Sequence, residues 1–428
     1  MINLSIGVLT TFSDFDPSYS LVSVVKNQLE MLTRNGYKTV LFTLPQFKDD
    51  AMVPDGVEIR KIVPQFVLEP YGKYDLSIDL PTTFESDAKI AQTAFEENMQ
   101  DMNVVLTHDI FFINSYLIYN KAIRDAMIDK LKGVRWFNWI HSGPSLRPSN
   151  IPYPHDLRYS VPPNSKMIFL NDTDVLRMAE MYGGTLNDFR VVRNPIDLPE
   201  FLSFHPLSKK IYNDYKLYEA DIIQTYPLST PRMESNKQVS KVIKVFSKLK
   251  QQGKKVRLIV CNAHANAENE KNAIQETLKL AEGEGLTKEE VIFTSLVDAP
   301  TWEHGVPHKV VSDLFLLSNL FVFPSVSENC PLILLEAAAC KNLLVLNNSF
   351  PVFKDFFSDS ALYFEFGSSV KNVNYTDEEK YYHEVALIII GELSRERGYR
   401  ANNELKHKYN LDFIFKNYLE PLFYETWQ

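Results

Sequence analysis

The sequence predicts an α/β protein made of two doubly wound domains, and three observations lead to this fold class. Short apolar runs alternate along the chain with longer segments whose apolar residues recur at helical spacing, which is the order of parallel βαβ units. The length of 428 residues suits two or three domains. The stretch 319–347 reads as a buried strand, a polar loop and a helix, the arrangement at which open α/β sheets bind ligands.

The first half of the chain follows this alternation from its start. A strand at 2–10, a helix at 21–34 ended by Asn35-Gly36, and a strand at 37–44 form a parallel βαβ start. Further strands are predicted at 57–63, 103–107, 134–140 and 166–170. Helices are predicted at 86–99, 110–132 and, after caps at 171–174, up to residue 182. Six prolines between 144 and 163 predict a long ordered loop.

The second half repeats the alternation with its own strands and helices. Strands are predicted at 221–225, 256–261, 291–294, 320–323 and 361–364. Helices are predicted at 239–251, 269–282, 310–317, 332–340, 377–397 and 412–427. This alternation leads us to expect a second domain of the same class. No internal sequence repeat or low-complexity tract is present.

Composition excludes several classes of protein. No apolar run reaches the ~18 residues of a membrane span, and the first ten residues read as a strand and not as a signal peptide. The three cysteines, Cys261, Cys330 and Cys340, have neither metal nor disulfide spacing, which suits a reducing cytoplasm. The net charge of −9 disfavours nucleic acid. No dinucleotide or P-loop glycine pattern occurs, which disfavours a nicotinamide dehydrogenase or a P-loop kinase.

The stretch 319–347 carries two carboxylates eight positions apart. Glu328 ends the polar loop after the strand, and Glu336 is the only ionisable residue of an otherwise apolar helix that Pro331 begins. A loop that leaves a strand and enters a helix N-terminus is where α/β sheets hold phosphorylated ligands, and two acids there suit sugar hydroxyls. The alternative is a buried helix in which Glu336 pairs with an Arg or Lys.

Residues 324–340, PSVSENCPLILLEAAAC, resemble the glutamate–seven–glutamate signature of retaining GT-B glycosyltransferases of family 4 (glycosyl transferases group 1). The match ends at Cys340, because Lys341 stands where the family usually has a glycine. The resemblance implies the GT-B fold, in which two Rossmann-like domains face a cleft. It also implies that Glu328 binds the hydroxyls of the transferred sugar and that Glu336 binds the ribose of the donor.

A second pattern of the family, R-x-x-x-x-K-G, has a counterpart in Arg232 and Lys237, with Gln238 in place of the glycine. In the family these cations hold the donor diphosphate, for which Arg provides a fork and Lys a point charge. The backbone N–H groups that follow Pro331, at Leu332 and Ile333, are further candidates for holding the phosphates. A solvated basic pair is the alternative.

Two histidines stand at the carboxyl ends of predicted strands in the first domain. His141 precedes Ser142-Gly143 and resembles the family's histidine beside the transferred sugar. His108, followed by Asp109, resembles a second, less constant histidine, and we assign His108 and Asp109 to the acceptor side. The alternative for each is a hydrogen-bonded structural histidine. Asp14 and Asp16 form a D-x-D pattern that we interpret as a turn capping the next helix and not as a metal site.

The resemblance also predicts the division of the chain. Asn194-Pro195-Ile196-Asp197 resembles the family's N-G-V-D segment at the end of the first domain. We therefore expect an acceptor-side domain at 1–197, a donor domain at 198–410, and a C-terminal helix at 411–428 that returns to the first domain.

The function implied is a metal-independent, retaining hexosyltransferase that moves a sugar from a nucleotide-diphosphate sugar, with a UDP-sugar as the default, to an acceptor hydroxyl. No cofactor is expected, and the acceptor stays open between a glycan, a glycolipid, a small molecule and a protein, as do peripheral membrane contact and the oligomeric state. The alternatives are a sugar phosphorylase or nucleotide-sugar epimerase of the same fold, a non-catalytic sugar-binding homologue, and an enzyme that modifies DNA bases, which the net charge disfavours.

Overall fold

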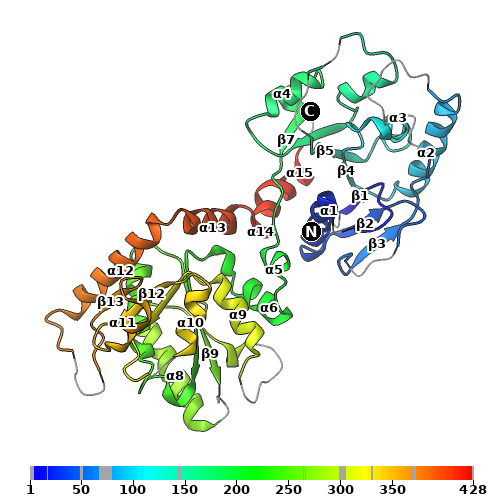
Figure 1. Cartoon of the computed structure of the whole chain (residues 1–428). Helices are drawn as coiled ribbons and strands as arrows, with labels where there is room; N and C mark the ends of the chain where they lie inside the picture. Colours follow the sequence, from blue (N-terminus) through cyan, green and yellow to red (C-terminus); the bar gives the residue numbers. More distant parts are fainter. Residues whose placement is uncertain are drawn as a thin grey trace. The chain divides into compact units, whose positions relative to one another are not determined.

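The computed structural model divides the chain into two compact units, one of residues 1–197 with 409–428 and one of residues 198–408. Both units are drawn in Figure 1. The structure describes residues 4–16, 18–48, 52–66, 80–142, 146–147, 149–263, 265, 267–297, 305–328, 331–368 and 373–426.

A parallel sheet of seven strands forms the centre of the first unit, in the order β3-β2-β1-β4-β5-β6-β7 (Figure 1). The strands are β1 (Ser5–Leu9), β2 (Lys38–Phe42), β3 (Val57–Arg60), β4 (Val104–His108), β5 (Arg135–Trp139), β6 (Ser165–Phe169) and β7 (Phe189–Val191). Strands β1, β4, β5 and β6 are almost fully buried, as expected for parallel strands covered on both faces.

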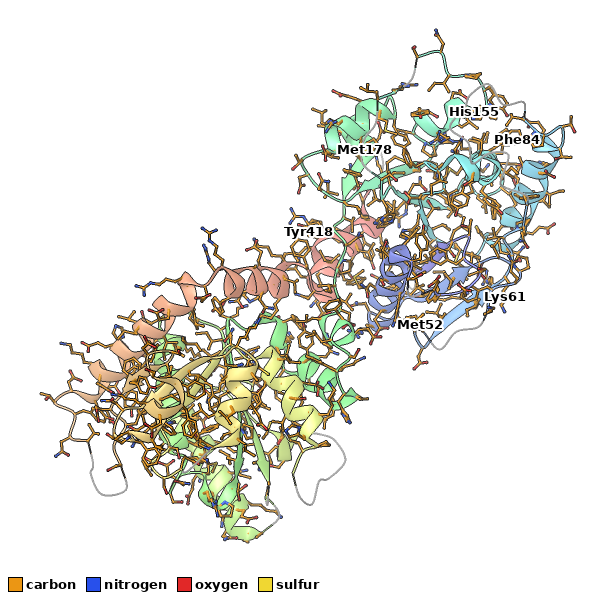
Figure 2. All side chains as sticks on the ribbon, viewed as in Figure 1. Met52, Lys61, Phe84, His155, Met178 and Tyr418 are labelled. Atoms are coloured by element: carbon orange, nitrogen blue, oxygen red, sulfur yellow. The ribbon has the colours of Figure 1, made fainter. Side chains whose placement is uncertain are left out.

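Helices cover both faces of this sheet and bury two separate apolar clusters. The helices are α1 (Ser20–Arg34), α2 (Phe84–Asn98), α3 (Leu117–Ile128) and α4 (Val175–Met181), with short 3-10 helices at Asn114–Tyr116, His155–Tyr159 and Leu186–Asp188. One cluster, with Phe84 and Met178, involves α2, α3 and α4, while the other lies beneath α1 and includes the partly buried Met52 and Tyr418, labelled in Figure 2. The first unit is therefore doubly wound.

The C-terminal segment packs on the first unit, in red beside its sheet in Figure 1, through α14 (Leu411–Ile414), a π-helix (Phe415–Leu419) and α15 (Glu420–Tyr424). The Tyr37 hydroxyl donates to Glu420 at 3.0 Å, and Arg190 pairs with Glu425. The prediction of one regular helix was wrong in detail, because a π-helical turn, a local widening that inserts one residue, interrupts it before Pro421.

In the second unit, the strands that the structure describes form two sheets, ordered β10-β9-β8 and β11-β12-β13, and the pairing within each sheet is parallel. They are β8 (Ile222–Ser229), β9 (Val256–Ala263), β10 (Val291–Phe293), β11 (Leu320–Phe323), β12 (Leu343–Asn347) and β13 (Leu362–Phe364). Side chains join the two sheets edge to edge between β8 and β11. The Gln224 amide bonds both the N–H and the C=O of Val322, at 2.8 and 2.9 Å. The Ile223 N–H donates to the side-chain oxygen of Asn319 at 3.1 Å, and the Asn319 backbone N–H donates to the Ile223 carbonyl at 3.0 Å.

The helices of the second unit share one large apolar cluster with these strands. They are α5 (Leu198–Phe201), α6 (Pro206–Asp214), α7 (Val239–Gln251), α8 (Glu268–Gly283), α9 (His308–Leu317), α10 (Leu332–Ala339), α11 (Val352–Phe357), α12 (Glu378–Arg395) and α13 (Arg397–Lys408), with 3-10 helices at Leu217–Glu219, Thr230–Arg232 and Thr294–Leu296. The predicted α/β class, with two Rossmann-like units, is confirmed.

Two further expectations need correction in the first unit. The helix predicted at 110–132 begins only at Leu117, because Asp109 takes a left-handed φ of +56° and a turn and a 3-10 helix follow it. The loop predicted at 144–163 contains a 3-10 helix at His155–Tyr159. Among the described residues, no helix combines the length and the apolar character needed to cross a membrane.

Candidate functional site

The second unit brings together the cation of one predicted motif and the first acid of the other. The Lys237 ammonium contacts a carboxylate oxygen of Glu328, 91 positions later in the sequence. Both side chains are 13% exposed, so the pair is largely withdrawn from water. The Lys237 nitrogen also lies 4.8 Å from the centre of the Phe323 ring at the end of β11, where a cation–π attraction adds to the ion pair.

A buried serine holds Glu328 from the other side. Ser325 is fully buried, and its hydroxyl lies 2.7 Å from the same Glu328 oxygen and 3.2 Å from the carbonyl oxygen of Asn236. The Val326 N–H donates to that carbonyl at 3.2 Å. The loop after β11 is thereby bonded directly to the loop that carries Lys237.

The Lys237 loop is closed on itself and on strand β8. The Arg232 carbonyl accepts from the Lys237 N–H at 3.1 Å, and the buried Tyr226 hydroxyl donates to the Lys237 carbonyl at 2.7 Å. The Arg232 side chain is exposed, and no described residue bonds it. The structure therefore fixes the backbone of both cations, holds Lys237 in an ion pair and leaves the Arg232 guanidinium open to solvent.

Helix α10 begins directly beyond this loop, and Asn329 and Cys330, which precede Pro331, lie outside the described residues. The N–H groups of its first turn, those of Leu332 and Ile333 among them, have no partner within the helix, as in any α-helix. They are a place for an anion because the helix dipole is positive at this end.

Glu336 does not have the buried position that its apolar neighbours suggest. Its side chain is 34% exposed, and its Oε1 lies 3.0 Å from Nε2 of His308 at the start of α9. The alternative interpretation, a buried helix, does not hold, because Leu332 and Leu335 on α10 are also exposed, at 68% and 40%. The described partner of Glu336 is a histidine, and not the Arg or Lys of the alternative interpretation.

In the first unit the predicted residues His108, Asp109 and His141 form one cluster at the carboxyl ends of β4 and β5. Nδ1 of His108 lies 2.9 Å from Nε2 of His141, and Nε2 of His108 lies 2.9 Å from Oε1 of Gln28 on α1. Asp109 Oδ1 accepts from the His141 N–H at 2.8 Å. Gly143, the last residue of the predicted His-x-Gly segment, lies outside the described residues.

Burial shifts the proton affinity of all three groups in this cluster. It lowers the pKa of His141 to about 4 and that of His108 well below its usual value, so both rings are neutral near pH 7. Burial also raises the pKa of Asp109 to about 6, against the opposing effect of the His141 N–H bond. The cluster offers neutral hydrogen-bonding groups and a carboxyl group that titrates close to physiological pH.

The remaining sequence candidates have local roles in the described chain. Asp16 Oδ1 accepts from the Ser18 N–H at 2.8 Å just before α1, which confirms the predicted turn. The predicted capping was wrong, because Tyr19 is the N-cap of α1 and no side chain caps this helix. No group of three or more His, Cys, Asp or Glu side chains among the described residues is placed to hold a metal ion. The sequence analysis did not single out Gln28, Ser325 or His308, although Ser325 belongs to the quoted 324–340 motif.

Comparison with known proteins finds a family model that matches part of the second unit. Residues 224–377 match the model of glycosyl transferases group 1, and this range includes Arg232, Lys237, Glu328 and Glu336. The resemblance that the motif carries is thereby confirmed for this region. No curated protein matches the chain in sequence.

Solved structures similar to the chain include a glycosyltransferase from Rickettsia africae, with 12% identity and a TM-score of 0.35, covering 98% of each chain. A sucrose-phosphate synthase from Thermosynechococcus elongatus has 13% identity and a TM-score of 0.36, again covering 98% of each chain. Anabaena Alr3699/HepE in complex with UDP-glucose has 13% identity and a TM-score of 0.34, covering 98% of this chain and 99% of the other.

Proposed function

We propose that this chain, whose residues 224–377 match glycosyl transferases group 1, moves a sugar from a nucleotide-diphosphate sugar to an acceptor hydroxyl with retention at the anomeric carbon. The observation that carries the proposal is the contact between Lys237 and Glu328. It joins a candidate phosphate cation and a candidate sugar ligand in one largely buried site beside a helix N-terminus. These are the groups that the two ends of a sugar diphosphate require.

The chemistry follows from where charge develops in the reaction. When the bond between the anomeric carbon and the diphosphate breaks, negative charge grows on the leaving oxygen, and groups fixed beforehand stabilise it best. Lys237 and the N–H groups of Leu332 and Ile333 are held by the fold, and Arg232 adds a fork that can bond two phosphate oxygens. The leaving phosphate itself takes the acceptor proton, so no separate base and no metal ion is required.

Glu328, Glu336 and the histidine cluster would bind the rest of the substrates. Glu328 is an acceptor for sugar hydroxyls, and Lys237 and Ser325 fix one of its oxygens, which orients the other. Glu336, partly exposed on α10, would take the ribose hydroxyls, with Pro331 setting the start of that helix. In the first unit His141, with His108 and Asp109 behind it, would bond a hydroxyl of the transferred sugar or of the acceptor.

The test is a screen of nucleotide sugars against the full chain, with UDP-sugars first. A donor present at a hundred times its dissociation constant stabilises the protein by about 2.7 kcal/mol, which a thermal melt detects readily. A donor that stabilises the chain should also be hydrolysed slowly, and NMR should show the released or transferred sugar first in the anomeric configuration of the donor.

Two matched variants separate binding from fold. Glu328→Gln keeps the shape of the side chain and should lose most turnover, whereas Glu392→Gln, on the partly exposed face of α12, should change nothing. The absence of stabilisation by any nucleotide sugar would contradict the proposal. An inverted first product would remove the retaining mechanism, and turnover that needs inorganic phosphate would instead identify a phosphorylase.

A further inference from the structure

A chain of hydrogen bonds links helix α1 to His141 through two buried side chains. Gln28 and His108 are 3% and 4% exposed, and His141, the last residue of this hydrogen-bond series, is partly exposed. The two links, Gln28 to His108 and His108 to His141, both measure 2.9 Å between the bonded atoms. This buried series of hydrogen bonds ends at His141, a candidate for binding the substrate, and it can determine which nitrogen of the His141 ring carries the proton.

The two histidine rings meet edge to edge, as a hydrogen bond in the ring plane requires. Their planes differ by 21°, and their centres are 5.2 Å apart. Rings packed face to face would keep their nearest atoms about 3.5–4.0 Å apart, which is farther than the 2.9 Å between these two nitrogens. The 2.9 Å contact is therefore a directed N–H···N bond, in which one ring must donate and the other must accept.

The direction of donation follows from the Gln28 oxygen. An amide oxygen only accepts, so Nε2 of His108 carries the hydrogen that it shares with Gln28. A neutral imidazole has a single N–H, so Nδ1 of His108 has a lone pair and must accept from Nε2–H of His141. His141 then has an unprotonated Nδ1. Burial lowers the pKa of both rings, which keeps them neutral and keeps this assignment in force near pH 7.

The structure assigns to Gln28 the role of a positioning residue, which through His108 fixes the tautomer of His141 so that its Nδ1 accepts a hydrogen bond. The group that His141 binds must then be a donor, such as a hydroxyl, and cannot be an anionic oxygen. The identification of that hydroxyl with one on a sugar rests on the proposed function, while the tautomer itself does not.

The experiment uses two substitutions at Gln28 and one at its neighbour. In Gln28→Glu the spectra are recorded at a pH at which the new carboxyl is ionised and His108 stays neutral, so that the carboxylate can only accept and cannot turn to present a donor as an amide can. Gln28→Leu removes the acceptor. Asn27→Leu is the matched control, because Asn27 also lies on α1 and bonds the Pro195 carbonyl at 3.3 Å, away from the histidines.

The first readout is long-range proton–nitrogen NMR of histidine-labelled full chain without substrate, with the His141 signals identified by their loss in His141→Gln. We expect Nε2 of His141 to be protonated and Nδ1 not, in the wild type, in Gln28→Glu and in Asn27→Leu. Gln28→Leu should show a mixture of tautomers. The second readout is kcat/KM, which should fall roughly three- to ten-fold in Gln28→Leu, the size of one hydrogen bond, and recover in Gln28→Glu.

The two ways of failing are distinct. A wild-type His141 that is protonated at Nδ1, or a tautomer that reverses in Gln28→Glu, would overturn the assignment whatever the activity of the chain. The assigned tautomers in a chain that transfers no sugar would instead overturn the proposed function. An unchanged tautomer population in Gln28→Leu would show that Gln28 does not position His141, even if the variant is less stable.

Discussion

At the residue scale, the two candidate phosphate cations differ in how the protein holds them. Lys237 is largely buried against Glu328 and Phe323, whereas Arg232 is exposed and no described residue bonds it. Part of the Lys237 charge is thus already compensated before a donor arrives. In the proposed function, Arg232 is therefore the cation whose full charge would remain for the leaving group.

This difference predicts that Arg232→Ala affects turnover more than binding. Removing one donor to a developing oxyanion typically lowers kcat by ~10²–10³. Arg232→Lys should rescue only part of the loss because the fork is gone. The double variant with Lys237→Ala should cost less than the sum of the single changes, since both cations act on one charged group. The measurements are kcat and the dissociation constant of the donor.

Arg400→Ala, a change of another exposed arginine on α13, controls for the loss of one positive charge. It should leave both constants unchanged. Turnover near the wild-type rate in Arg232→Ala would take this residue out of the site and leave the assignment resting on Lys237 and the two glutamates.

Glu336 permits a separation of binding from stability. Its carboxylate is 34% exposed and its partner His308 is 78% exposed, so little folding energy depends on their pair. Glu336→Gln loses charge-assisted bonds to the ribose, each worth roughly 1.5–3 kcal/mol, and donor affinity should fall about ten-fold or more. Isothermal titration and thermal melts report the two quantities. A lower melting temperature with unchanged affinity would assign Glu336 a purely structural role.

Asp109 predicts a pH dependence of stability whose sign can be worked out. Burial raises the pKa of this carboxyl to about 6, whereas in the unfolded chain it ionises near its ordinary value of 3.8. As the pH rises from 4 to 6 the unfolded chain loses this proton first, so the folded state loses stability across that window and stays penalised above it. Asp109→Asn removes the penalty and tolerates the left-handed φ of +56°.

The variant should therefore be more stable than the wild type at pH 8, by on the order of 3 kcal/mol, and nearly equal to it at pH 3, where the carboxyl is protonated in both the folded and the unfolded chain. Urea unfolding at the two pH values measures the difference. Asp55→Asn, at an exposed turn, should show no such pH-dependent gain. An equal effect of Asp109→Asn at both pH values would mean that ionisation of Asp109 is not what costs stability.

At the scale of elements, the ends of two helices explain where the chain departs from the family motifs. Gln238, before α7, has a φ of +53°, and Lys341, after α10, has a φ of +59°. Both stand where the resembled motifs have glycine. Gln238 and Lys341 thus adopt the left-handed backbone that glycine adopts most easily, and this conformation costs a non-glycine residue about 1–2 kcal/mol.

Lys341→Gly should therefore raise the free energy of unfolding, by about 0.5–1 kcal/mol after the added flexibility of the unfolded chain is counted. Lys341 is exposed, so the loss of its side chain adds little. Gly253→Ala is the mirror control, because Gly253 has a φ of +79° and open space around a new Cβ, and it should destabilise. A Lys341→Gly variant that is no more stable would show that the strain at this position is already relieved.

The elements show how far local sequence determines this fold. Helix α7 and strand β11 were predicted with their observed ends, since each has a clear apolar period or run. Strand β8 was predicted to stop at Thr225, before Pro227, but it continues to Ser229 because β9 pairs with it along its whole length. The polar stretch after Leu198 hides α6, whose few apolar residues pack on the second unit.

Some residues of the candidate site can be recognised from the local sequence, and others only from their contacts in the folded chain. Motif spacing was enough to select Arg232, Lys237, Glu328 and Glu336, and the structure brings Lys237 and Glu328 into contact. No local pattern selects Gln28 or His308, since each acts on a candidate residue at least 28 positions away on another element. Contacts of that kind are decided by tertiary packing.

At the scale of the whole molecule, the candidate donor groups and the histidine cluster belong to different units. All four donor-side residues lie in residues 198–408, within the region that matches the glycosyltransferase model, and His108, Asp109 and His141 lie in the first unit. The chain leaves the first unit after Asp197 and returns to the first unit at Tyr409. Each unit has its own apolar core and its own candidate substrate-binding residues.

An acidic protein with a net charge of −9 could use metal ions to bind an anionic donor. Arg232, Lys237 and the N-terminus of α10 already provide positive potential for the diphosphate, so turnover should be unchanged in a strong chelator. Asp14→Asn with Asp16→Asn should also keep full activity, at the price of a slightly weaker turn, because the Asp16 carboxylate already bonds the Ser18 N–H.

The measurement is the transfer rate after exhaustive dialysis against chelator, with and without added Mg²⁺ or Mn²⁺, for the wild type and the double variant. The same assay with Arg232→Ala serves as a sensitivity control, since losing a phosphate cation must register. A complete loss of turnover that Mn²⁺ restores in the wild type but not in the double variant would assign the metal to Asp14 and Asp16. In that case the cations of the second unit would share the charge of the leaving group with a divalent ion.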